Sequence, residues 1–193
     1  ELNAADVMES RGLAYELLAF ESTADTQAGF VDGRCDMQTS DRSQLLALQA
    51  STDNPAEYAV WVEMFSKEPL GPVYRHGDNQ WGNIVDWVTY GTIQAEEFGI
   101  TSANLAELLR QEGESDEDYS ARVGPGVARF LDDSLGIGSK LGLSNGFMTD
   151  VISQVGNYGE IFSRHLGEEG LGWVRGANEL WTKGGQIYSP AWR

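Results

Sequence analysis

The fold is decided by residues 33–48, which have the sequence GRCDMQTSDRSQLLAL. Residues 35–39 are predicted to form a short buried strand, and residues 42–48, with leucines at positions 45, 46 and 48, begin a helix. Ser40 and Asp41 lie at the switch between the two. In an open α/β sheet such a switch lies at the carboxyl edge of the strands, where these sheets bind ligands. The stretch therefore predicts an α/β fold with a candidate ligand contact at Asp41.

Asp41 also has an interpretation as a helix cap. Gln44 follows it by three residues, which is close to the spacing of a capping box. In that arrangement the Asp41 carboxylate only accepts hydrogen bonds from the first helical turn. Both interpretations stay open on the residues alone.

The neighbouring segments extend the same pattern. Helices are predicted over residues 2–11 and 24–31, and strands over residues 13–20 and 58–64. Such alternation of helices and strands is typical of βαβ units and a largely parallel sheet.

The second half of the chain is predicted to be mostly helical. Pro69, Gly71 and Pro72 indicate a crossing segment over residues 66–78, with a short strand at 73–75. A long helix over residues 80–98 has apolar residues at helical spacing, and shorter helices follow at 105–111, within 124–145 and at 147–162. Residues 112–119 contain five acids and are expected to form a solvated loop.

Composition excludes several classes of function. Of 193 residues, 30 are acidic and 13 basic, and the resulting charge of −17 repels nucleic acid and anionic membranes. No apolar run approaches the roughly 20 residues that span a bilayer, and the first ten residues lack the features of a signal peptide. One cysteine and two histidines are too few for a convincing zinc site, and the glycines at 136, 138 and 142 match no phosphate-binding loop. We therefore expect neither a metal nor a cofactor.

Three stretches in order carry a family resemblance. They are residues 33–48, residues 65–104 (FSKEPLGPVYRHGDNQWGNIVDWVTYGTIQAEEFGITSAN), and a tail with SKLGLSNGF, QVGNYGEIFSRHLG and RGANELWTKGGQIYSPAWR. Together they resemble the general L-amino-acid-binding group of periplasmic solute-binding proteins of ABC transporters. The resemblance implies a periplasmic location and a partial periplasmic-binding-protein-like (type II) fold. Its sheet would be rich in parallel strands and its C-terminal half largely helical.

The resemblance also implies an absence. Such proteins have two α/β lobes joined by crossing strands, and the ligand is enclosed between the lobes. The first lobe, with its carboxylate-binding arginine, would precede Glu1 and be missing from these residues. Residues 1–66 would then be the remainder of the second, ligand-binding lobe. Residues 67–193 would be the returning crossover strand and a helical extension that packs on the first lobe. The disulfide partner of Cys35 would lie on the missing strand.

Site residues follow from the same resemblance. Asp41 matches the acid that receives the α-ammonium group of the ligand, a charge-assisted contact that can orient a zwitterion. Thr39 and Ser40 would line the cleft beside it. Lys67 and Glu68 would form a solvated pair at the hinge.

The leading hypothesis is a non-enzymatic protein that binds a zwitterionic amino acid and presents it to an ABC permease. Without the first lobe, ligand binding is expected to be impaired. The alternative is an oligomerisation or interaction module, which would pair with another copy through exposed sheet edges and the apolar face of the helix over residues 80–98. An enzyme such as a dehydratase is disfavoured because Asp41 has no obvious acid–base partner.

Overall fold

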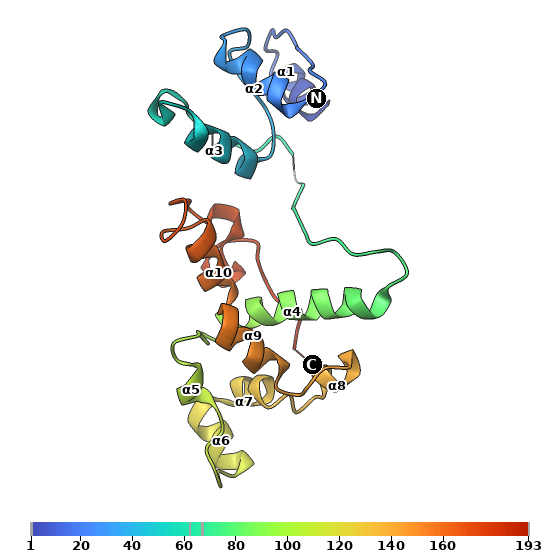
Figure 1. Cartoon of the computed structure of the whole chain (residues 1–193), viewed down its shortest axis with the longest axis vertical. Helices are drawn as coiled ribbons and strands as arrows, with labels where there is room; N and C mark the ends of the chain where they lie inside the picture. The colour runs from blue at the N-terminus through green and yellow to red at the C-terminus, as the bar shows by residue number, and fades with distance from the viewer. Residues whose placement is uncertain (1, 62, 67, 193) are drawn as a thin grey trace. The chain divides into compact units, whose positions relative to one another are not determined.

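The computed structural model describes residues 2–61, 63–66 and 68–192. It divides into two compact units, Glu1–Gly71 and Pro72–Arg193 (Figure 1). Two positions of interest lie outside the described residues. They are Val62, within the strand predicted over residues 58–64, and Lys67 of the predicted hinge pair.

The first unit contains the helices predicted from the sequence. They are α1 (Leu2–Ser10), α2 (Thr23–Val31) and α3 (Arg42–Ser51), followed by a short 3₁₀ turn, η1 (Pro55–Glu57). The hydroxyl of Ser22 caps α2 by accepting a hydrogen bond from the Asp25 amide at 3.1 Å. Gly33 follows α2 with a φ of 74°, a backbone conformation that glycine adopts without strain.

The predicted parallel-rich sheet is not confirmed. Residues 13–20 and 35–39, and the described part of residues 58–64 and 73–75, carry no strand. Across the described residues the β structure is one isolated bridge, between Leu180 and Ile187. A strand exists only where a second segment pairs with its backbone, and among the described residues none of these predicted strands is paired in this way.

The first unit also has almost no buried interior. Among its described residues, Gly29 is the only one that is buried, and it lies against the ring of Phe20. Apolar residues of the strand predicted over residues 13–20 are exposed: Leu13, Tyr15 and Leu17 are 51%, 42% and 46% exposed. This unit therefore holds its helices without a packed core of its own.

The second unit is helical, as predicted. Its long helix is α4 (Asn79–Glu97), capped by the Asp78 carboxylate, which accepts from the Trp81 amide at 3.2 Å. Shorter elements follow: α5 (Leu105–Leu108), α6 (Asp116–Val123), α7 (Pro125–Leu131), α8 (Ile137–Leu141), α9 (Phe147–Val155), α10 (Tyr158–His165), η2 (Gly176–Asn178) and η3 (Trp181–Lys183). The single helix predicted over 147–162 is two helices, because Gly156 has a φ of 78° and Asn157 starts α10 with a capping box.

A continuous apolar core lies inside this second unit. Helices α8, α9 and α10 contact α4, and α7 contacts α9 (Figure 1). Trp192 closes the core near the end of the chain and makes edge-to-face contacts with Phe130 and Trp87 at centroid distances of 4.9 and 5.2 Å. The apolar residues Ile84, Trp87 and Val88 of α4 pack against this core. The apolar face of α4 is therefore partly covered within its own unit, while Trp81 at its start is 54% exposed.

The expectation of a solvated loop over residues 112–119 is wrong in part, because α6 begins at Asp116. The hydroxyl of Ser115 accepts from the Asp118 amide at 3.1 Å and caps the helix. Three acids in the first turn face the partial positive charge of the helix N-terminus, which favours them there. The acidic run is thus a solvated turn over residues 112–115, followed by a solvent-exposed helix start at Asp116.

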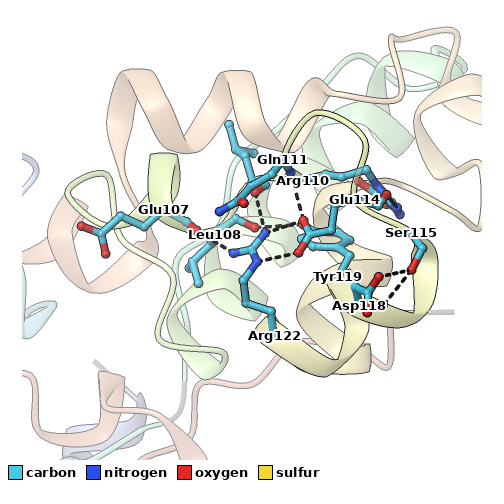
Figure 2. A network of polar contacts seen from close by, with 11 residues as sticks. Glu107, Leu108, Arg110, Gln111, Glu114, Ser115, Asp118, Tyr119 and Arg122 are labelled. Carbon is cyan, nitrogen blue, oxygen red and sulfur yellow. Dashed lines mark hydrogen bonds and ion pairs between the residues drawn. The ribbon is translucent and has the colours of Figure 1, made fainter.

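Arg122 ties α6 to the preceding segment through a bidentate ion pair with Glu114. The Nε and Nη2 atoms of Arg122 lie 2.7 and 2.8 Å from the two carboxylate oxygens (Figure 2). The same guanidinium donates to the backbone carbonyls of Glu107 and Leu109 at 2.8 and 2.9 Å. The hydrogen bond from Arg122, followed by one from the Gln111 amide, lowers the pKa of Glu114 to about 2.

Tyr119 anchors the inner side of α6. Its side chain is fully buried, and its hydroxyl donates to the Leu108 carbonyl at 2.9 Å. The guanidinium of Arg110 lies 4.6 Å from the ring centroid and pairs with Asp132. Burial raises the pKa of Tyr119, so its hydroxyl stays protonated and keeps donating through the neutral range. These contacts are directed inward and account for the fold of residues 105–132.

The Glu114–Arg122 pair predicts a pH dependence of stability. The folded pKa of Glu114, about 2, lies below its ordinary value of 4.5, so ionisation favours the folded chain. This contribution is complete above the ordinary value and is lost as the pH falls through about 2. We expect Glu114→Gln to lower the melting temperature by a few degrees at neutral pH. The variant should also lose part of the increase in melting temperature that the wild-type chain shows as the pH rises from about 2 to 4.5.

Thermal unfolding followed by circular dichroism measures both effects. Glu112→Gln is the matched control, because it removes a carboxylate at an exposed position two residues away. An equal effect of both substitutions would show that general charge repulsion, rather than the ion pair, governs the pH dependence.

Candidate functional site

The three candidate residues Thr39, Ser40 and Asp41 precede α3, and all three are exposed. Asp41 occupies the N-cap position, with φ −54° and ψ 136°, and its carbonyl accepts from the Leu45 amide at 2.9 Å. The structure therefore places these side chains together at the start of one helix and open to solvent.

The Asp41 carboxylate does not cap α3. The helix has no side-chain hydrogen bond at its N-cap, so the capping-box interpretation of Asp41 and Gln44 is wrong. By contrast, Ser22, Asp78 and Ser115 each accept from an amide of the helix that they precede. The Asp41 carboxylate is thus an exposed anion whose acceptors are not used by the helix that follows.

Gln44 forms a hydrogen bond that the sequence analysis missed. Its side-chain oxygen accepts from the hydroxyl of Ser40, one residue before the N-cap. The four-residue spacing of Ser40 and Gln44 could have indicated this bond, because residues four apart at a helix start lie on the same side. The sequence pattern instead favoured a capping box between Gln44 and Asp41, which are three positions apart.

The remaining candidates lie elsewhere in the first unit. Cys35 is half-buried and its thiol is free. Glu68 of the predicted hinge pair accepts from the Asn3 amide group at 2.9 Å. A hollow of about 440 Å³ in this unit does not include the three candidates; it is lined by Ala19, Phe20, Glu21, Asp25, Ala28, Gly29, Asp32 and Arg34.

Among the described residues, no group of three or more histidine, cysteine, aspartate or glutamate side chains is arranged to hold a metal ion. Of the helices described, none is both long enough and apolar enough to cross a membrane. The ion pairs around Tyr119 use their donors and acceptors within the unit, which leaves the acceptors at residues 40–41 as the stronger candidate site.

The chain is similar to two curated amino-acid-binding proteins over nearly its whole length. It is 43% identical to the general L-amino acid-binding periplasmic protein AapJ of Rhizobium johnstonii, covering 98% of this chain and 53% of that protein. It is 39% identical to the glutamate/glutamine/aspartate/asparagine-binding protein BztA of Rhodobacter capsulatus, covering 100% of this chain and 54% of that protein. The chain therefore spans about half the length of these relatives. No family model matches it.

A solved structure gives the same result for the fold. An ABC transporter periplasmic binding protein from Brucella ovis, with glutathione bound, is 36% identical and superimposes with a TM-score of 0.81. The match covers 98% of this chain and 56% of that one. The fold is thus that of part of a periplasmic binding protein. Over the just more than half of their length that it spans, the chain is thus similar to amino-acid-binding proteins and to a periplasmic binding protein of an ABC transporter.

Proposed function

We propose that this chain acts in the periplasm as the amino-acid-binding component of an ABC transporter and catalyses no reaction. Residues 1–66 contribute part of the ligand-binding lobe. Residues 67–193 contribute the returning crossover and a helical extension. Closure of two lobes on the ligand, a hinge motion, delivers it to the permease. The names of the relatives support this assignment, because each is a binding protein rather than an enzyme.

One observation carries the proposed site: the Asp41 carboxylate is exposed and makes no capping hydrogen bond. An aspartate at an N-cap ordinarily satisfies the first helical turn, which stabilises a helix by about 1 kcal/mol. At Asp41 these acceptors remain open to a ligand. An ammonium group suits them, because it brings only donors and a positive charge.

The proposed ligands share a free α-amino acid group. One relative is named for general L-amino acids, and another for glutamate, glutamine, aspartate and asparagine. The Brucella ovis protein has bound glutathione, whose γ-glutamyl end also carries an α-ammonium and an α-carboxylate on one carbon. We assign the α-ammonium of this shared group to Asp41, with Ser40 and Thr39 beside it. A γ-glutamyl peptide therefore belongs to the same ligand class as glutamine.

Affinity should be low in a polypeptide of residues 1–193 alone. The contacts at residues 39–41 engage one end of a zwitterion, and they lie on a unit with almost no packed interior. Ordering such a unit costs free energy that ligand binding must offset. We assign the carboxylate contact to the part of the relatives' length that this chain does not span.

The test is titration of the isotope-labelled polypeptide with L-glutamine, followed through backbone amide NMR shifts. We expect shifts centred on residues 39–45 with a dissociation constant of about 1 mM or weaker. Asp41→Asn should weaken binding about tenfold or more, since a hydrogen bond to a charged group is worth about 1.5–3 kcal/mol. N-acetyl-L-glutamine, which lacks the ammonium group, should shift these amides little.

Asp36→Asn is the matched control, because Asp36 is an exposed aspartate five residues away. Micromolar binding by the monomeric polypeptide would contradict the impairment. Equal losses in the two variants would remove Asp41 from the site.

A second function, self-association, is favoured by exposed apolar residues in the first unit. Trp61, Met64 and Leu70 are 60%, 62% and 77% exposed, and the extended segments beside them carry no strand pairing. Unpaired extended backbone with apolar side chains can pair with a second copy.

If the chain self-associates, light scattering should show dimers or larger species at tens of micromolar. A dissociation constant in that range corresponds to an association free energy of about −6 kcal/mol. Replacing Trp61 and Met64 by serine should give a monomer. Leu171→Ser is the control, because Leu171 is an exposed leucine of the second unit. A wild-type monomer throughout this range would exclude the function.

A further inference from the structure

The hydrogen bond between Ser40 and Gln44 has a chemical consequence for the proposed ligand site. A serine hydroxyl has one hydrogen to donate and two lone pairs that accept. The Ser40 hydroxyl donates its hydrogen to the side-chain oxygen of Gln44. What Ser40 can still offer to a ligand is therefore acceptors alone.

Asp41, the next residue, offers the same kind of group. An ionised carboxylate accepts hydrogen bonds and donates none. Its oxygens are not taken by a capping bond to α3. Two adjacent exposed side chains thus present only acceptors, and one of them carries a full negative charge.

This arrangement opposes the ordinary preference of a helix N-terminus. The first amides of a helix point outward and carry a partial positive charge, so the start of α3 by itself would favour an anion. A zwitterionic ligand has both a cationic and an anionic end. If the Ser40 hydroxyl could turn its hydrogen outward, it would join the helix amides in binding the ligand carboxylate.

We infer that Gln44 is a positioning residue that sets which end of the ligand this site accepts. By holding the Ser40 hydroxyl hydrogen, it keeps the pair Ser40–Asp41 selective for the ammonium end of a ligand over the carboxylate end. The inference rests on the proposed function and adds to it the residue that determines specificity.

A purely structural role for Gln44 is the competing explanation. In a capping box, the side chain at this position bonds back to the N-cap amide and stabilises the helix start. The side chain of Gln44 lies instead with Ser40, and the reciprocal bond from Asp41 is absent. A role in specificity and a role in helix stability make different predictions, because the first depends on the Ser40 hydroxyl.

The experiment compares the binding of L-glutamine and N-acetyl-L-glutamine to residues 1–193 by amide NMR shifts. Gln44→Met has a similar shape and removes the acceptor, so the preference for glutamine should fall about threefold to tenfold. Gln44→Glu keeps an acceptor and should retain the preference. Ser40→Ala, at an exposed position, should lower it by a similar factor to Gln44→Met.

The double variant supplies the decisive comparison. In the Ser40→Ala background, Gln44→Met should have no further effect on the preference, since the hydroxyl that Gln44 holds is gone. A further loss there would overturn the inference, because Gln44 would then act without Ser40. An unchanged preference in Gln44→Met alone would also overturn it, while leaving the proposed function standing.

Failure of the proposed function gives a different result. If glutamine shifts no amide near residues 39–45 of the wild-type chain, both the function and the role of Gln44 fall. If circular dichroism shows that Gln44→Met is unfolded, the inference is decided by the effects of Ser40→Ala and Gln44→Glu on the preference for L-glutamine over N-acetyl-L-glutamine.

Discussion

Pairing of backbone hydrogen-bonding groups is the constraint on which the whole structure depends. A helix pairs its amides and carbonyls within one segment, whereas a strand needs a second segment beside it. In the second unit almost every element is helical, and a core forms around Phe130, Ile152 and Trp192. In the first unit the helices form as well, but the extended segments between them lack strand pairing and Gly29 alone is buried among its described residues.

The same constraint explains which parts of the fold the sequence could predict. Starts and ends of helices depend on local signals, such as Ser22 before α2, Asp78 before α4 and the glycine at position 99 after it. These were predicted correctly. Strands at residues 13–20 and 35–39 have the right alternation of residues, but alternation does not supply a partner segment. The start of α6 was not predicted for another reason. The density of acids at residues 112–118 indicates a loop, but Arg122 pairs with Glu114 in this run and Arg110 pairs with Asp132 beside it.

At the candidate site, the sequence narrowed Asp41 to two roles and could not choose between them. Both a cap and a ligand contact use an acid at a strand-to-helix switch, so the pattern is the same. The choice depends on where one carboxylate and one carboxamide point. The structure places Gln44 with Ser40 and leaves the Asp41 carboxylate uncapped. Spacing along the chain allows a hydrogen bond from Gln44 to residue 41 or to residue 40 equally well, and only the structure distinguishes the two.

The position of the site on a unit without a core limits how it can work. A ligand contact usually owes its geometry to a packed scaffold that holds several side chains in place. Here the geometry of residues 40–44 comes from one helix and one hydrogen bond between neighbouring turns. Such a local arrangement persists without the sheet, whereas contacts that need a second segment do not. On the proposed function, selection of the ammonium end therefore depends only on residues 40–44. Ordering the site costs free energy, and burial of the exposed apolar segments of the first unit can supply it. Strong binding therefore requires that these segments become buried when the ligand binds.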